Sequence, residues 1–130
     1  MIKQYSLSFG KIKVFDDYII AEIFEGINLD TALNEILLDI CSAHFPKRPF
    51  GYISNRVNSY SVDPTVYKYT AKNSNLVAIA VVASGELKKL SANIEKLFFD
   101  REFEYFEEID EAKEWIEHII KSEKAHSNQS

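Results

Sequence analysis

Polar and apolar residues alternate along the first part of the chain. Residues 3–9 follow this period of two, which predicts a half-buried strand. Turns at residues 10–11 and 16–17 separate it from two further short strands, at 12–15 and 18–24. Three short strands with tight connections predict an antiparallel meander at the start of the fold.

The period then changes to that of a helix. Asn28 or Asp30 can cap the N-terminus of this helix. Pro46 and Pro49 end it, because proline cannot continue a helix. The apolar stripe of the helix consists of Leu29, Leu33, Ile36, Leu37, Ile40 and Cys41.

The rest of the chain alternates between strand and helix patterns. The predicted elements are, in order, a strand at 50–57, a short helix that Asp63 caps with Pro64 at its first position, a strand at 76–83, a helix that Ser84 caps, a strand at 103–106, and a helix that Asp110 caps. The element order is therefore βββαβαβαβα. Strands that alternate with helices predict an α/β fold with a mixed, mostly parallel sheet and right-handed crossovers.

The apolar positions of the later elements predict which side chains form the core. Strand 76–83 is apolar throughout, so we expect it to be covered on both faces. Its two predicted faces are Val77, Ile79 and Val81 on one side, and Ala78, Ala80 and Val82 on the other. The helix after Ser84 carries one stripe, made of Leu87, Leu90, Ile94, Leu97 and Phe98. The last helix has an inner stripe of Ala112, Trp115, Ile116, Ile119 and Ile120, and Trp115 is expected to be at least half buried.

The length of the chain indicates the number of domains, and its charge excludes some classes of partner. A chain of 130 residues is the size of one domain, which we place at 1–121, followed by a polar disordered tail at 122–130. The net charge of −5 comes entirely from residues 86–130, with twelve acidic and seven basic side chains. Such a negative surface repels a phosphate backbone or an anionic membrane, so we expect no nucleic-acid partner.

Segment lengths and cysteine content indicate the compartment. The longest apolar run, Leu76–Ala83, is too short to cross a bilayer, which takes about 20 residues as a helix. We therefore expect no membrane insertion. A single cysteine allows no internal disulfide, and the first residues carry no apolar signal core. These features favour the cytoplasm.

The sequence contains no recognisable catalytic or metal-binding motif. Four isolated glycines allow no phosphate-binding loop. His44, His118 and His126 are scattered, and Cys41 lies on an apolar stripe, where thiols are usually inert. We therefore predict no enzyme activity, no metal site and no cofactor.

One polar segment is the best candidate for function. Residues 54–64 leave a strand and enter a helix, and in open α/β sheets ligands bind at that edge. Serine, asparagine and aspartate are also common in ordinary turns and caps, so this alternative stays open. The candidate binding residues are Asn55, Arg56, Asn58, Ser59, Tyr60, Ser61, Asp63 and Tyr67.

With these elements in place, the chain resembles the SpoIIAA-like branch of the STAS superfamily, often grouped with the CRAL-TRIO lipid carriers. The resemblance rests on the segments Tyr5–Gly10, Phe50–Pro64 and Phe103–Trp115. It implies a single-domain SpoIIAA-like sandwich and a bacterial source. Better-known relatives are anti-sigma factor antagonists that bind a partner kinase and are phosphorylated on a serine between a strand and a helix.

The place that matches this serine is the loop 58–63, where Ser59 and Ser61 are the candidate switch positions. Arg56 could pair with an added phosphate. The relatives' glycine-containing turn is absent, and Asp63 would repel the phosphate, so we expect recognition of the unmodified loop.

Two functions follow as expectations. The first is a non-enzymatic regulatory or protein-interaction module that binds a protein partner through the loop 54–63. The alternative is a small carrier of an apolar molecule or lipid, like the CRAL-TRIO proteins. A closed apolar cavity lined by Tyr60, Tyr67 and Phe98 would favour the carrier, and a flat exposed loop would favour the module. A homodimer is compatible with both.

Overall fold

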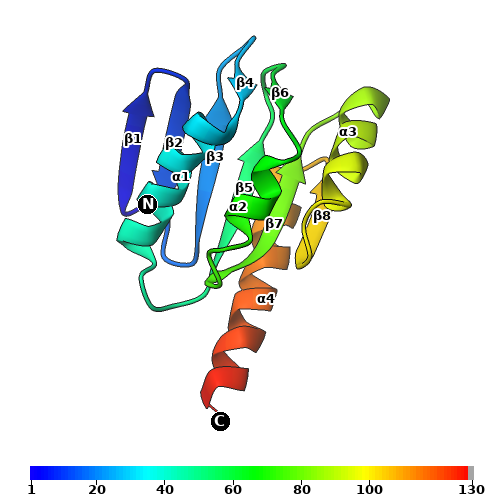
Figure 1. Cartoon of the computed structure of the whole chain (residues 1–130). Helices are drawn as coiled ribbons and strands as arrows, with labels where there is room; N and C mark the ends of the chain where they lie inside the picture. Colours follow the sequence, from blue (N-terminus) through cyan, green and yellow to red (C-terminus); the bar gives the residue numbers. More distant parts are fainter. Residues whose placement is uncertain (129–130) are drawn as a thin grey trace.

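A six-stranded mixed sheet runs through the middle of the protein (Figure 1). The computed structural model describes residues 1–128, with side-chain environments for residues 1–125. The strands of this sheet are β1 (Lys3–Leu7), β2 (Gly10–Val14), β3 (Tyr18–Ile23), β5 (Phe50–Asn55), β7 (Leu76–Val82) and β8 (Glu102–Phe106). They lie in the order β1-β2-β3-β5-β7-β8. The first three are antiparallel neighbours, and β3, β5, β7 and β8 are parallel.

Helices cover both faces of the sheet. The helices are α1 (Thr31–His44), α2 (Val66–Thr70), α3 (Glu86–Lys96) and α4 (Ile109–Asn128). Figure 1 shows α1, α2 and α3 on one face and α4 on the other. The predicted α/β class and the mostly parallel sheet are confirmed. The element order is also as predicted, with one addition, a small two-stranded parallel sheet of β4 (Asn28–Leu29) and β6 (Ser61–Val62).

The helix caps agree with the sequence only in part. The carboxylate of Asp30 caps α1 by accepting a hydrogen bond from the Leu33 backbone N–H at 3.1 Å. Ser84 does not cap α3, because Gly85 occupies the N-cap position with φ 101°, a conformation that favours glycine. The helix α4 begins at Ile109, so Asp110 lies in its first turn.

The core has two halves, one on each face of the sheet. Between the sheet and α1, α2 and α3 lie Phe45, Phe50, Leu37 and other large side chains. Between the sheet and α4 lie Ile53, Ile116 and Ile120, among others. Each Å² of apolar surface buried on either face stabilises the folded state by about 25 cal/mol. This burial is the main favourable contribution to the free energy of folding.

The strand β7 is the shared wall of the two halves. Ile79 and Val81 face the α1 side, and Ala78, Ala80 and Val82 face α4, as predicted. Val77 was predicted on the same face as Ile79, but it packs on the α4 side and is only partly buried. The reason is an irregularity in the pairing of β5 with β7, where successive partners are Leu76 and Ala78. A bulge of this kind breaks the alternation of faces.

The last helix is longer than the sequence indicated. Trp115 is partly buried and packs near Phe106, with ring centroids 5.4 Å apart, which agrees with the prediction that it is at least half buried. The helix α4 continues to Asn128, so residues 122–128 are helical rather than the predicted disordered tail. Residues 129–130 of that tail lie outside the described residues.

Candidate functional site

The loop that follows β5 joins a small ribbon at the carboxyl edge of the parallel strands. After Asn55 the chain leaves the main sheet and returns as β6, which pairs with β4 (Figure 1). We call this feature the β4–β6 ribbon, residues 25–29 and 57–62. It projects from the edge of the sheet where α/β folds bind their ligands.

Backbone hydrogen bonds hold the ribbon in one conformation. The Gly26 N–H donates to the Ser59 carbonyl at 2.9 Å, and the Ser61 N–H donates to the Ile27 carbonyl at 3.0 Å. Side chains add to this. The carboxylate of Glu25 accepts from the Ser59 N–H at 2.8 Å, and the Asn58 side chain donates to the Ile23 carbonyl at 3.0 Å. The loop is therefore preorganised rather than loose.

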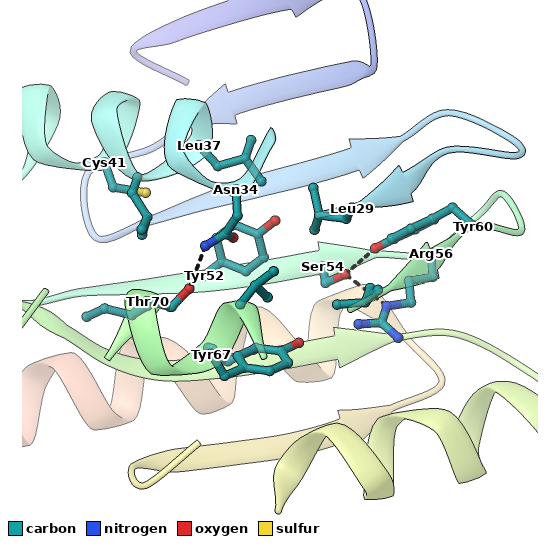
Figure 2. Close-up of a pocket in the computed structure, with 15 residues that line it drawn as sticks. Leu29, Asn34, Leu37, Cys41, Tyr52, Ser54, Arg56, Tyr60, Tyr67 and Thr70 are labelled. Carbon is teal, nitrogen blue, oxygen red and sulfur yellow. Dashed lines mark hydrogen bonds between the residues drawn. The ribbon is translucent and has the colours of Figure 1, made fainter. Parts of the chain in front are cut away.

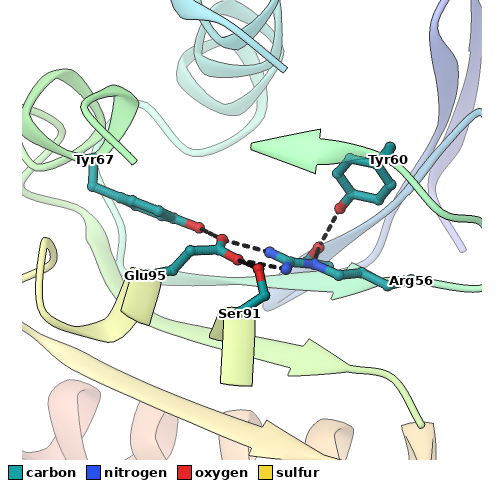
Figure 3. A network of polar contacts seen from close by, with 6 residues as sticks. Arg56, Tyr60, Tyr67, Ser91 and Glu95 are labelled. Atoms are coloured by element: carbon teal, nitrogen blue, oxygen red, sulfur yellow. Dashed lines mark hydrogen bonds and ion pairs between the residues drawn. The ribbon is translucent and has the colours of Figure 1, made fainter. Parts of the chain in front are cut away.

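Arg56 is a buried charge at the base of the ribbon. Its guanidinium makes a bidentate pair with the carboxylate of Glu95, with both N–O distances 2.6 Å (Figure 3). Both side chains are almost fully removed from solvent, with 8% and 3% of their surface exposed. Its Nε donates to Ser54 Oγ at 3.0 Å, and Ser54 shares a further hydrogen bond with the Tyr60 hydroxyl at 2.8 Å.

Glu95 is the centre of this network. Besides Arg56 it accepts from the Tyr67 hydroxyl at 2.5 Å and from Ser91 Oγ at 3.3 Å. The network joins β5, the ribbon, α2 and α3 (Figure 3). Because a buried charge is tolerated when it is paired and fully hydrogen-bonded, these residues fix one another in place.

The same burial shifts the titration of these groups. Burial by itself would lower the pKa of Arg56, but the hydrogen bonds and charge of Glu95 outweigh it and leave the pKa raised. Burial also raises the pKa of Tyr67 well above its usual value, and the neighbouring Glu95 adds to the effect. Both side chains therefore keep their protons throughout the physiological range, and neither serves as a general base.

A small cavity lies beneath the ribbon, between the sheet and α1 and α2 (Figure 2). Its volume is about 30 Å³, which leaves room for only a few water molecules. Burial raises the pKa of the Cys41 thiol on its wall to about 12, so this cysteine is a poor nucleophile. The wall includes Leu29, Asn34, Leu37, Cys41, Tyr52, Ser54, Tyr60, Val66 and Tyr67.

The predicted site residues divide between surface and interior. Ser59 and Ser61 are exposed, and Asn55, Asn58, Tyr60 and Asp63 are partly exposed. Arg56 and Tyr67 are buried in the network, so Arg56 is not free to pair with a phosphate on the loop. Hydrogen bonds from the side chain and backbone of Thr65 lower the pKa of Asp63, so this carboxylate remains charged beside the loop.

Sequence reasoning missed two partners of the site. Glu95 was not singled out, because a charged residue beside the apolar stripe of a helix usually indicates a solvated position, whereas Glu95 is only 2% exposed. Glu25, which fixes the Ser59 backbone, lies in a segment read as a connection. Neither contact could be inferred from spacing along the chain, because each joins residues more than thirty positions apart.

Comparison with known proteins places the fold in a family. The family model described as SpoIIAA-like matches residues 8–117, which is most of the chain. The chain belongs to the SpoIIAA-like family. The resemblance to this branch of the STAS superfamily seen in the sequence is thereby confirmed.

A solved structure of the same fold supports this membership. It is an uncharacterised protein of the DUF3478 family with a SpoIIAA-like fold from Shewanella loihica PV-4. The two chains are 16% identical, with a TM-score of 0.57, and the match covers 82% of this chain and 91% of the other. At this identity the likeness concerns the fold alone. No curated protein sequence matches the chain.

Residues 1–128 contain neither a candidate metal cluster nor a membrane-spanning helix. In that part of the chain no group of three or more histidine, cysteine, aspartate or glutamate side chains is arranged to hold a metal ion. None of the helices described there combines the length and hydropathy required to span a bilayer.

Proposed function

We propose that this SpoIIAA-like protein is a non-enzymatic interaction module that recognises a protein partner through the tip of the β4–β6 ribbon. The observation that carries the proposal is the rigid, exposed polar loop at the carboxyl edge of the parallel strands. Val57 in this loop is 62% exposed, the Arg56 N–H before it donates to the Val82 carbonyl, and the backbone of Ser59 and Ser61 after it is hydrogen-bonded to Gly26 and Ile27. A loop that is already ordered loses little entropy when a partner binds.

Recognition of the unmodified loop fits this geometry better than a phosphoserine switch. The nearest arginine, Arg56, is committed to Glu95, and the ionised Asp63 would repel an added phosphate. The Ser61 hydroxyl also donates to the Asn28 side chain at 2.8 Å, so it contributes to the ribbon itself.

The test compares partner capture by matched variants. Val57→Asp and Ser59→Arg change the exposed loop of the ribbon. The matched controls Ile36→Asp and Ser42→Arg introduce the same two residues, Asp and Arg, at exposed positions on α1. We expect all four to fold, because exposed substitutions usually change stability by about 0.5 kcal/mol or less. Proteins captured from the native lysate by the wild type should be lost with the ribbon variants and retained with the α1 variants. Equal capture by all four would overturn the proposal.

The size of the cavity argues against the carrier as the main function. Sites for drug-sized ligands have volumes of about 300 Å³ or more, far above the volume of about 30 Å³ found for this cavity. Its wall contains Tyr60 and Tyr67 as a carrier would need, but Phe98 is 48% exposed and lies elsewhere. An apolar molecule retained by the purified protein in native mass spectrometry would favour the carrier instead.

A further inference from the structure

The hydroxyl group of Tyr52 faces the cavity beneath the ribbon and has no hydrogen-bond partner among residues 1–128 (Figure 2). In that part of the chain, every side-chain nitrogen or oxygen atom that is sealed from water does have a partner. The Tyr52 oxygen must therefore be within reach of water. Burial raises the pKa of Tyr52 well above its usual value, so the hydroxyl keeps its proton and can donate as well as accept.

A second hydroxyl proton is available on the sheet side of the cavity. Ser54 Oγ accepts a hydrogen bond from Arg56 Nε at 3.0 Å and shares another with the Tyr60 hydroxyl at 2.8 Å. If Tyr60 donates in this pair, the Ser54 proton is left over, and if Ser54 donates, the Tyr60 proton is left over. Both side chains line the cavity, so either arrangement leaves a donor there.

The helix side of the cavity carries an amide that is only half used. Asn34 on α1 is 7% exposed, and its Nδ2 donates to Thr70 Oγ1 on α2 at 2.9 Å. Whichever way the amide is turned, one of its two polar ends is left without a partner among residues 1–128. Asn34 and Thr70 both line the cavity, so this side also has unused hydrogen-bonding capacity.

We propose that the cavity is an internal binding site for a small group of ordered water molecules, held by Tyr52, Asn34 and the Ser54–Tyr60 pair. A buried water molecule needs about two to four polar partners, and these side chains provide them. The volume of about 30 Å³ suits a few water molecules and no larger ligand. Cavities that stay dry are apolar, unlike this one.

The proposed waters lie between two polar groups that the protein itself leaves apart. Ser54 and Tyr60 belong to the Arg56 network at the base of the ribbon, whereas Asn34 and Thr70 join α1 to α2. Water in the cavity would link the two groups and help to hold the ribbon in place. The inference does not rest on the proposed function, because a hydrated cavity requires no partner at the ribbon.

Crystal structures at a resolution that shows ordered water give the direct test. We expect density for water within hydrogen-bonding distance of the Tyr52 hydroxyl, and its loss in Tyr52→Phe. Tyr105→Phe is the matched control, because it removes a hydroxyl that donates to the Ala83 carbonyl at 2.7 Å, away from the cavity. It should keep the water. An empty cavity in the wild type, an organic molecule there, or water unaffected by Tyr52→Phe would each overturn the proposal.

Urea denaturation tests the same site in solution, with circular dichroism to check that each variant folds. If water partners the hydroxyl, Tyr52→Phe should lower the folding equilibrium constant by up to about fivefold, through the loss of one hydrogen bond. In a dry cavity the same substitution would remove an unpaired polar group and raise this constant. A raised folding equilibrium constant would therefore contradict the proposal.

Filling the cavity gives an independent measurement. Val66→Ile adds one methylene group at a wall position, and in the wild type it should displace water and leave the Tyr52 hydroxyl unpaired. In the Tyr52→Phe background that hydroxyl is absent, so the loss in folding equilibrium constant should be smaller by about fivefold or more. The steric cost of the added group is common to both backgrounds and cancels in the comparison. Equal losses in the two backgrounds would mean that the cavity is dry.

Discussion

Arg56 and Glu95 show how the meaning of a charged residue depends on where the chain places it. In the sequence, Arg56 stands in a polar segment that reads as an exposed binding loop. In the structure it is buried, and its partner comes from a helix 39 positions away. Ser59 and Ser61, from the same segment, are exposed as such a loop would be. Composition can therefore locate a polar segment at the edge of the sheet, but long-range pairing decides which of its residues face outward.

Removing either member of the Arg56–Glu95 ion pair should destabilise the protein. We expect Arg56→Met and Glu95→Gln each to lower the free energy of unfolding by about 3–5 kcal/mol, because each leaves the buried pair incomplete. The double variant removes both charges, and the glutamine that replaces Glu95 would still accept the hydrogen bond from Tyr67. Its loss should therefore be smaller than the sum of the two single losses.

Urea denaturation of the four proteins completes this double-mutant cycle. If the two losses simply add, the pair is not coupled and the network is not what fixes α3.

At the scale of elements, the sequence predicted which helices and strands form better than it predicted which of their faces turn toward the core. The alternating strands and helices were found because hydrophobic period and proline and glycine positions are local signals. The stripe of α3 was found for the same reason, but its side chains are 47–83% exposed, because α3 buries Ala92 and Glu95 instead. The β4–β6 ribbon was missed because each of its strands has only two residues, too few to show a period.

The packing of α4 on β5 depends on one glycine. Gly51 has no side chain, and a Cβ added there would press into Ile116, which is fully buried. Gly51→Ala should therefore destabilise the protein by about 1–3 kcal/mol through overpacking. Ile116→Ala alone should cost about 2–5 kcal/mol by leaving a cavity.

Combining the two substitutions tests the contact itself. The added methyl group of Gly51→Ala would occupy part of the space that Ile116→Ala leaves, so the double variant should lose less than the sum of the two single losses. Thermal and urea melts give the three values. Strict additivity would mean that α4 already lies farther from β5 than the structure places it.

The whole molecule is the scale at which the sequence was most informative. The predicted order βββαβαβαβα fits one mixed sheet, because parallel strands need helical crossovers of one hand and short turns join antiparallel ones. Strand 76–83 reads as covered on both faces, and β7 is the wall shared by both halves of the core. The surfaces that would meet partners could not be read in this way, since they depend on contacts between distant segments.

The predicted domain boundary at residue 121 can be tested by truncation. Residues 121–125 of α4 are exposed, and the last buried apolar residue of that helix is Ile120. The described contact that this part of the helix makes with the body is an exposed ion pair of Lys124 with Asp17 at 3.0 Å, and such pairs contribute about 0–1 kcal/mol.

A chain that ends at residue 121 should therefore melt within about 5 °C of the full chain. Lys124→Ala in the full chain separates the loss of the ion pair from the loss of the helical turns. A chain that ends at residue 115 is the matched control. It lacks Ile116 and Ile120, which close the core on the α4 face, so we expect it to be unfolded by circular dichroism. A large loss of stability on ending the chain at 121 would show instead that the last turns of α4 belong to the domain, because the exposed turns would then be supporting the buried ones.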